Sequence, residues 1–126
     1  MTELVLADTS AWITFFQKRN NLAQTLQGLI LDNRVVRCGM VELELKQGFR
    51  KDEARLLALV MGFKSLDTNA ADFSAAGDAL GGLRRSGFTI PPSDGLIAAV
   101  AVRHGVELLT DDKHFKHYPG LKLFEP

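Results

Sequence analysis

The chain has 126 residues, of which 46% are apolar and 24% are charged, as in an ordinary globular protein. We expect a single domain over residues 1–126, because this length suits one core. Lys and Arg together number 15, as do Asp and Glu, so no global basic field marks a constitutive nucleic-acid binder. Cys38 is the only cysteine and cannot form an internal disulfide. The sequence has neither a long uncharged apolar run nor a signal-peptide pattern, so we expect a cytoplasmic protein without a membrane segment.

The first third of the chain predicts two short strands and two helices. Residues 4–7 form a continuous apolar run, which is typical of a strand buried on both faces. It ends at Asp8, and the hydroxyls that follow favour the start of a helix. Residues 21–31 carry leucines at helical spacing, and residues 35–38 predict the second strand.

The middle of the chain is predominantly helical by its periodicity. Helices are expected over residues 40–49, 52–60 and 69–85, with a short strand within 62–67. Gly87 lies where a glycine would cap the end of the long third helix.

The last third predicts a buried helix followed by two strands. Ser93 is expected to cap a helix that is apolar on every side and therefore crosses the core, and Gly105 closes it. Residues 106–110 predict a strand that runs directly into two aspartates, and residues 121–124 predict a final short strand.

The alternation of strands and helices defines the expected fold class. Strands separated by helices cannot pair as hairpins, so we predict an α/β domain with a mainly parallel central sheet and helices on both faces. Ligands of such sheets bind beyond the carboxyl ends of the strands.

Acidic residues lie at the expected carboxyl edge of this sheet. Asp8 follows the first strand, Asp111 and Asp112 follow the strand at 106–110, and Asp94 opens the buried helix. Glu42 and Glu44 lie early in the helix after the second strand. Taken singly, each is explained as a cap or a solvated helix position, but together they predict converging carboxylates. A hard divalent cation would relieve their mutual repulsion, because Mg²⁺ and Mn²⁺ prefer oxygen ligands.

Competing motifs are missing from the sequence. Neither GxGxxG nor GxxxxGK[ST] occurs, so nucleotide cradling is unsupported, and no serine has the GxSxG setting of a hydrolase. The DxD pattern of a phosphoaspartyl phosphatase is also lacking after the first strand. The three histidines lack the spacing of a zinc site, and we expect His114 and His117 to be exposed loop residues.

Five segments in order resemble the PIN-domain nucleases of VapC type, the toxins of bacterial toxin–antitoxin pairs. They are LADTSAW, ELKQG, SDGLIAAVA, LLTDDKHF and PGLKL, and they span residues 5 to 124. The resemblance implies a PIN-like α/β fold, an acidic Mg²⁺ site and endoribonuclease activity. It carries the four family acids onto Asp8, Glu44, Asp94 and Asp112, and the supporting hydroxyls onto Thr9, Ser10 and Thr110.

Two pairs of neighbouring acidic residues, Glu42 with Glu44 and Asp111 with Asp112, require a decision on which member belongs to the site. Glu42 and Glu44 point roughly 200° apart on a helix, so both cannot face the sheet edge. The family pattern Glu-Leu-x-x-Gly fits Glu44 to Gly48, and Thr-x-Asp-x-x-Phe fits Thr110 to Phe115, which selects Asp112 over Asp111.

We therefore predict an Mg²⁺-dependent endoribonuclease toxin, with Mn²⁺ as the alternative cation. Its catalytic and metal-binding residues are Asp8, Glu44, Asp94 and Asp112, with Asp8 and Asp94 as the first direct ligands. Two alternatives stay open: a non-catalytic PIN-like interaction module, and a metal-dependent nuclease acting on DNA. Arg84, Arg85 and Lys113 are candidates for contacts to phosphates.

The expected partners are an RNA substrate, a small VapB-like antitoxin and a second copy of the chain in a homodimer. The antitoxin follows from the resemblance, in which an antitoxin tail enters the acidic groove. The first two helices carry many large apolar residues, which either pack inside or offer a surface to such partners (Trp12, Phe15, Phe16, Leu22, Leu26 and Ile30).

Overall fold

The computed structural model of the chain describes residues 3–17 and 20–125. Its centre is a parallel sheet of strands β1 (Val5–Ala7), β2 (Val35–Cys38), β3 (Lys64–Leu66) and β4 (Glu107–Leu109). The spatial order is β3-β2-β1-β4, so the first and last strands of the chain lie side by side. All carboxyl ends therefore face the same edge, and the predicted parallel α/β class is confirmed.

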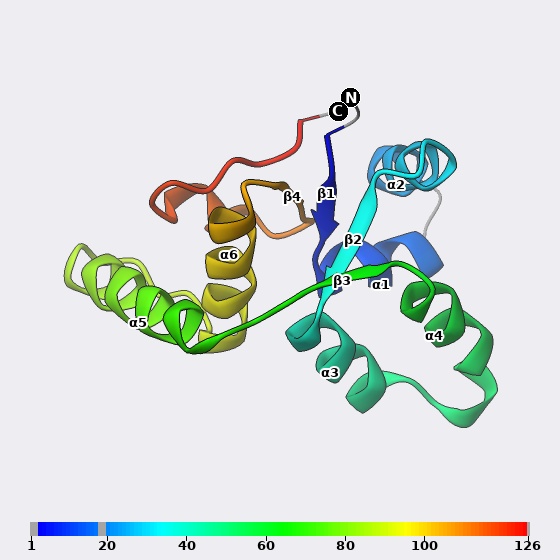
Figure 1. The fold of residues 1–126 in the computed structure, drawn as a ribbon, viewed down its shortest axis with the longest axis horizontal. Helices are drawn as coiled ribbons and strands as arrows, with labels where there is room; N and C mark the ends of the chain where they lie inside the picture. Colours follow the sequence, from blue (N-terminus) through cyan, green and yellow to red (C-terminus); the bar gives the residue numbers. More distant parts are fainter. Residues whose placement is uncertain (1–2, 18–19, 126) are drawn as a thin grey trace.

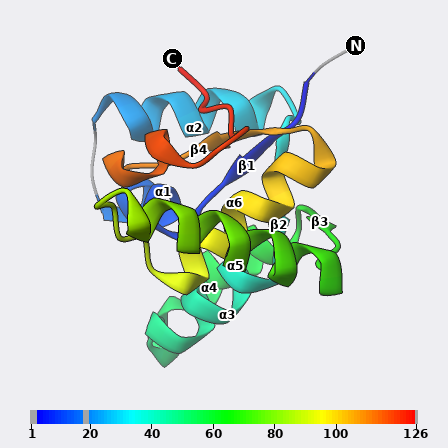
Figure 2. The same cartoon turned by 90° about the vertical axis from the view of Figure 1, so that its left-hand side faces the viewer.

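Helices cover both faces of the sheet (Figure 1). Helices α1 (Thr9–Gln17) and α2 (Asn21–Leu31) pack together on one side. On the other side lies α6 (Pro92–His104), and α5 (Ala70–Arg85) packs against it from outside, as Figure 2 shows. This arrangement makes α6 the layer between the sheet and α5.

The connection between β2 and β3 forms an arm of helices beyond the carboxyl edge. Helix α3 (Gly39–Gly48) starts directly after β2, and it is followed by the 3₁₀ turn η1 (Lys51–Glu53) and α4 (Ala54–Met61). The helix predicted over 52–60 is thus divided, because its first turn has 3₁₀ geometry. Helix α3 contacts α1 and α6, which brings its early residues toward both.

Helix α6 is the most deeply buried helix among the described residues. Every residue from Gly95 to Ala101 is buried, as its apolar sequence predicts. Gly95 allows α5 to approach closely, since a Cβ there would lie 2.5 Å from Cδ1 of Leu80. The contact fixes the first turn of α6, which carries Asp94.

The two glycines predicted to end helices are confirmed, whereas the predicted start of α6 after Ser93 is wrong. Gly87 and Gly105 follow α5 and α6 with φ of 92° and 67°, a left-handed conformation that favours glycine. Helix α6, however, begins at Pro92 rather than after Ser93, and its start has no side-chain cap. Pro92 presets the helical φ at the first position, so the helix starts earlier.

The segment predicted as a final strand lies beside β4. Leu123 forms a single parallel bridge to Leu108, supported by hydrogen bonds from Leu108 to Lys122 and from Phe124 to Leu108.

The apolar residues of the first two helices mostly pack inside. Trp12 and Leu26 are fully buried, and four others pack against the core: Phe15, Phe16, Leu22 and Ile30. Within the described residues, none of the helices has the length and apolar character needed to cross a membrane.

Candidate active site

Asp8 follows β1 at the carboxyl edge and is only 1% exposed. Its Oδ1 accepts hydrogen bonds from the backbone N–H of Ala11 (2.8 Å) and from the Ser10 hydroxyl (2.7 Å), and its Oδ2 accepts one from Thr110 (2.5 Å). Burial raises the pKa of Asp8 to about 6, although these hydrogen bonds oppose the shift. Asp8 therefore caps α1 and also belongs to the acidic edge.

A network of hydroxyls ties the start of α1 to the loop after β4. Thr110 Oγ1 accepts the backbone N–H of Asp112 (3.0 Å) while it donates to Asp8, and it lies 3.2 Å from Ser10 Oγ. Ser10 Oγ accepts the backbone N–H of Asp111 (2.9 Å). Residues about 100 positions apart in the sequence are thereby held in register, which orients the two aspartates that follow β4.

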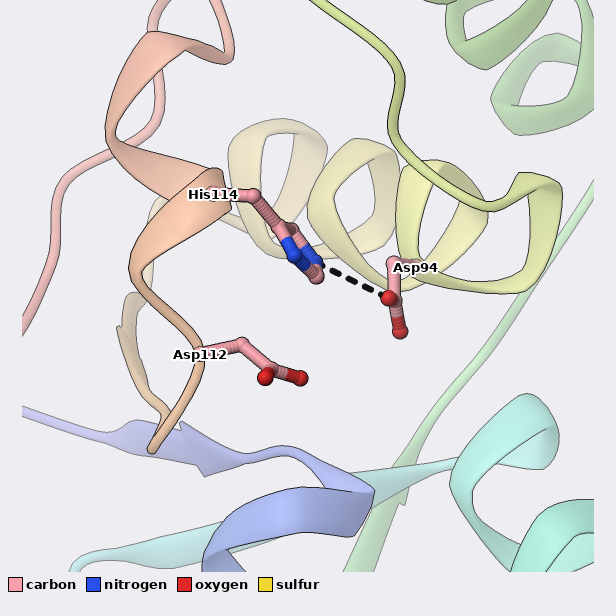
Figure 3. Close-up of side chains that lie close together, drawn as sticks. All are labelled: Asp94, Asp112 and His114. Carbon is pink, nitrogen blue, oxygen red and sulfur yellow. Dashed lines mark hydrogen bonds and ion pairs between the residues drawn. The ribbon is translucent and has the colours of Figure 1, made fainter.

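The two aspartates after β4 point to different partners. Asp111 accepts a hydrogen bond from the Thr14 hydroxyl (2.8 Å), on the side of α1. Asp112 instead turns toward the first turn of α6, where Asp94 lies (Figure 3). The side chains of Asp111 and Asp112 thus point in different directions, as the alternation of side chains along an extended backbone predicts.

Asp94, Asp112 and His114 form the candidate metal-binding cluster. One ligand atom from each lies within 4.8 Å of the others, and His114 Nε2 is 3.0 Å from Asp94 Oδ2. The three side chains converge from α6 and from the segment after β4, in which the 3₁₀ helix η2 (Lys113–His117) carries His114 (Figure 3). Burial raises the pKa of Asp94, opposed by His114, and the charges of Glu44 and Asp112 raise it further.

Glu44 and Glu42 face opposite environments, as their spacing on α3 predicts. Glu44 Oε1 accepts a hydrogen bond from the Thr9 hydroxyl (2.7 Å), which draws it toward the start of α1. Glu42 pairs with Arg37 (3.0 Å) and Lys46 (2.8 Å), and these partners lower its pKa. Glu44 is therefore near the acidic cluster, and Glu42 belongs to a separate ion-pair network.

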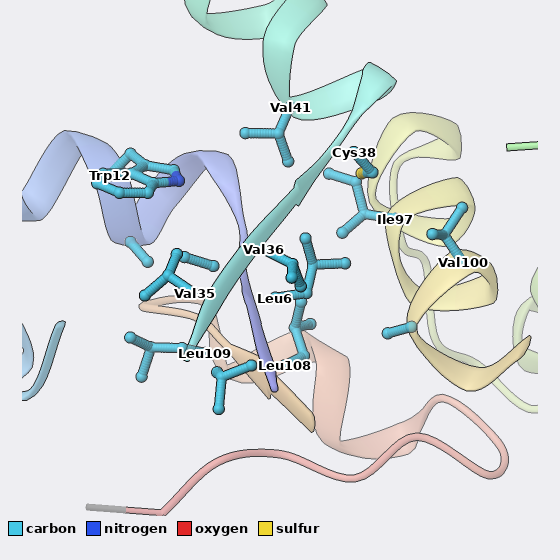
Figure 4. Packing of buried hydrophobic residues seen from close by; sticks show 14 of the residues in the cluster. Leu6, Trp12, Val35, Val36, Cys38, Val41, Ile97, Val100, Leu108 and Leu109 are labelled. Atoms are coloured by element: carbon cyan, nitrogen blue, oxygen red, sulfur yellow. The ribbon is translucent and has the colours of Figure 1, made fainter. Parts of the chain in front are cut away.

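The apolar core fixes the elements that carry these side chains. Leu6 of β1, Val36 of β2 and Leu108 of β4 are fully buried, and Ile97 of α6 lies in the same cluster (Figure 4). Burying a side chain of this size contributes about 1.5–3 kcal/mol. The core thereby holds β1, β4 and the N-terminal turn of α6 together, so the cluster rests on rigid elements.

The structure corrects the expectation for His114. This residue was expected to be an exposed loop residue, but it is only partly exposed and its ring faces Asp94, whereas His117 is exposed as predicted. The reason is the tight 3₁₀ turn of η2, which buries Phe115 completely and aims the preceding side chain at α6. The sequence carried a weak signal, since His114 is two residues from Asp112 and directly precedes an apolar anchor.

Comparison with known proteins identifies the family. Residues 5–121 match the PIN domain. The chain is 34% identical over 119 residues to the VapC ribonuclease Mb1587 of Mycobacterium bovis and to ribonuclease VapC11 of Mycobacterium tuberculosis, covering 89% of each chain. The chain therefore belongs to the PIN-domain family and, within it, to the VapC ribonucleases, as the sequence motifs predict.

Solved structures share the fold. The chain superposes on VapBC2 from Rickettsia felis, crystallised with a DNA fragment of its promoter, with a TM-score of 0.80, 23% identity and coverage of 96% and 97% of the two chains. It superposes on M. tuberculosis VapC20, described as a Sarcin-Ricin loop cleaving toxin, with a TM-score of 0.71, 16% identity and coverage of 97% and 99%. These likenesses show that the chain shares the overall fold of these proteins.

Proposed function

We propose that this chain is a metal-dependent endoribonuclease toxin that a VapB-like antitoxin silences. The observation that carries the proposal is the convergence of Asp94, Asp112 and His114 at the carboxyl edge, with Asp8 and Glu44 beside them. The VapC ribonucleases that this chain resembles over 89% of its length support RNA as the substrate.

The donor set fits a divalent cation. Asp94 and Asp112 would hold it, with Mg²⁺ as the first expectation and Mn²⁺ as the alternative, because both prefer oxygen ligands. The raised pKa of Asp94 fits this role, since this partly buried carboxylate lies beside Glu44 and Asp112 and, among the described residues, has only His114 to offset their charges. When bound, such a cation lowers the pKa of a water molecule and neutralises charge that develops on a scissile phosphate.

The other two acids have supporting roles in this proposal. Glu44 is fixed by Thr9 and lies close enough for its charge to raise the pKa of Asp94, so it is placed to complete the site or orient a water molecule. Asp8 holds the hydroxyl of Thr110, which in turn accepts the N–H of Asp112. Asp8 thus sets the position of Asp112 and also remains a candidate ligand.

Basic residues near the site are candidates for contacts to RNA phosphates. Lys113 is exposed and directly follows Asp112, and with Lys116 it lines a hollow of about 440 Å³ that also includes Asp112. Arg84 and Arg85 are exposed at the end of α5. Lys113 is the strongest of these candidates because it shares a hollow with a proposed site residue.

A hollow of this chain beside the acidic edge suits the expected antitoxin. A space of about 300 Å³ is lined by the apolar side chains of Ile13, Leu45 and Phe49. It is also lined by Gln17, by Glu44 and by Arg50, which is paired with Glu53 at 3.7 Å. An apolar segment carrying a basic side chain suits this lining, because Glu44 offers it a negative charge. We propose that the VapB-like tail binds here and that the toxin forms a homodimer, a state that light scattering at micromolar concentration tests.

RNA cleavage in Mg²⁺, Mn²⁺ or EDTA tests the proposed activity. Cleavage is expected with either cation and not in EDTA, and a variant with both Asp94→Asn and Asp112→Asn is expected to be inactive. A DNA strand of the same sequence separates ribonuclease from deoxyribonuclease activity, and titration with Mn²⁺ separates a catalytic domain from a non-catalytic module. Equal cleavage in EDTA would contradict the proposal, as would harmless expression of the chain without an antitoxin.

A further inference from the structure

His114 is the one member of the candidate metal cluster that is not an oxygen donor. It is also not among the four acidic positions that the VapC motifs assign. Its Nε2 lies 3.0 Å from Asp94 Oδ2, and the cluster places Asp112 on the same side. The question is whether this nitrogen binds the cation or only orients Asp94.

The spacing suits two ligands of one cation. Ligand bonds of about 2.1 Å at right angles place neighbouring donor atoms about 3.0 Å apart. The distance between His114 Nε2 and Asp94 Oδ2 has this value, and Asp112 completes a triangle within 4.8 Å. Donor atoms bound to one ion at about 2.1 Å lie at most about 4.2 Å apart, so the three side chains have to close inward around the ion. His114 Nε2 has to be unprotonated, and its hydrogen bond to Asp94 is then replaced by two bonds to the ion.

The packing of the neighbouring residue Phe115 sets the position of His114. It lies on η2, where the following residue, Phe115, is completely buried, and the two rings are 4.9 Å apart. At the other end of this short segment, Thr110 holds the backbone of Asp112. The imidazole is therefore presented to Asp94 from a fixed piece of backbone.

A nitrogen ligand changes which cations the site prefers. Mg²⁺ takes oxygen ligands and retains its waters. Mn²⁺ also takes oxygen ligands, but as a first-row transition ion it accepts an imidazole nitrogen more readily than Mg²⁺ does. We propose, resting on the metal site of the proposed function, that His114 Nε2 binds the cation directly and biases this site toward transition ions of the Mn²⁺ type over Mg²⁺. Asp94 and Asp112 supply the oxygen ligands of the same ion.

Pulsed electron paramagnetic resonance of the Mn²⁺-loaded protein tests the ligand directly, without any activity readout. Wild type is expected to show the ¹⁴N modulation of a bound imidazole, which His114→Gln should remove while Mn²⁺ still binds. His117→Gln is the matched control, because His117 lies on the same 3₁₀ helix but stacks on Phe88 with ring centroids 3.9 Å apart, so its variant should keep the signal.

Competition between Mn²⁺ and Mg²⁺ gives a second readout. In His114→Gln, the affinity for Mn²⁺ should fall by at least about 10-fold and that for Mg²⁺ by less than about threefold, so that the selectivity ratio drops. Mn²⁺ binding to wild type without ¹⁴N modulation would overturn this inference alone. Failure of wild type to bind Mn²⁺ at all would overturn both this inference and the metal site of the proposed function.

Discussion

Asp8 and Asp72 are both 1% exposed, yet their pKa values move in opposite directions. Burial raises the pKa of Asp8 to about 6, and its partners are neutral hydroxyls and one backbone N–H. The pKa of Asp72 is lowered, chiefly because Arg103 binds both of its oxygens at 2.7 and 3.0 Å. Asp72 is paired with a positive charge of the chain, whereas Asp8 has only neutral partners among the described residues, which fits the cation that we propose for this edge.

This contrast distinguishes acidic residues that stabilise the fold from those that we propose to bind a cation. Arg103 joins the end of α6 to Asp72 at the start of α5 and to Asp67 after β3, so this ion-pair network holds three elements together. The edge around Asp8, Asp94 and Asp112 lacks such a cation among its described hydrogen-bond and ion-pair partners, apart from His114, which carries charge only when protonated. Acid-to-amide changes should therefore reduce activity at the edge and reduce stability in the network.

The largest expected effect separates the two aspartates after β4. Asp112→Asn should reduce RNA cleavage at least ~100-fold, roughly 2.7 kcal/mol of transition-state stabilisation, because it removes a charge from the metal cluster. Asp111→Asn, whose parent contacts Thr14, should stay within about threefold, under roughly 0.7 kcal/mol. Initial rates at saturating Mg²⁺ measure both, and an inverted order would show that the register after β4 is assigned wrongly.

The two glutamates of α3 make the same comparison on a helix. Glu44→Gln should also reduce cleavage at least ~100-fold, since the charge near Asp94 is lost. Glu42→Gln should leave cleavage within about threefold, because Glu42 pairs with Arg37 and Lys46. The same rate assay decides, and equal losses in the two variants would count against the assignment of Glu44.

Asp8→Asn should stabilise the metal-free protein at neutral and alkaline pH. A carboxyl pKa that rises from 3.8 to about 6 on folding favours the folded state below pH 3.8, and this contribution is lost as the pH rises through 6. The shift corresponds to about 3 kcal/mol as a ceiling, and we expect about 2 kcal/mol at pH 8. Denaturant unfolding in EDTA should show this gain at pH 8 and only a small part of it near pH 4. A loss of stability at pH 8 would contradict the prediction.

Asp72→Asn should have a smaller effect of opposite sign. It weakens the charged hydrogen bonds with Arg103, which is partly exposed, so the free energy of unfolding should fall by about 1.5 kcal/mol at pH 7. Because the folded pKa of Asp72 is lowered, this stability is present above the unfolded pKa and is lost as the pH falls through the folded value. Asp78→Asn, an exposed site on the same helix, is the control, and RNA cleavage should be unchanged in both.

The sequence predicted those features that depend on local pattern. The strands, the helices and the all-apolar α6 follow from periodicity, and the 200° separation of Glu42 and Glu44 follows from helix geometry. The bond between Arg103 and Asp72 joins residues 31 positions apart and has no sequence signal. His114 could not be placed either, because its direction depends on a 3₁₀ turn and on the burial of Phe115. The start of α6 could not be fixed from the sequence, because both Pro92 and Ser93 favour the beginning of a helix and only the structure shows that Pro92 begins it.

The pairing of β1 with β4 has a consequence for biosynthesis. The Thr110 hydroxyl donates a hydrogen bond to Asp8, 102 positions earlier in the chain. Strand β1 can pair with β4 only after β4 has been synthesised. A nascent chain that has not yet reached Thr110 contains Asp8, Glu44 and Asp94 but lacks both the Thr110 hydroxyl that binds Asp8 and the Asp112 carboxylate that lies near Asp94. The order of synthesis therefore leaves the proposed site incomplete until the last part of the chain has been made.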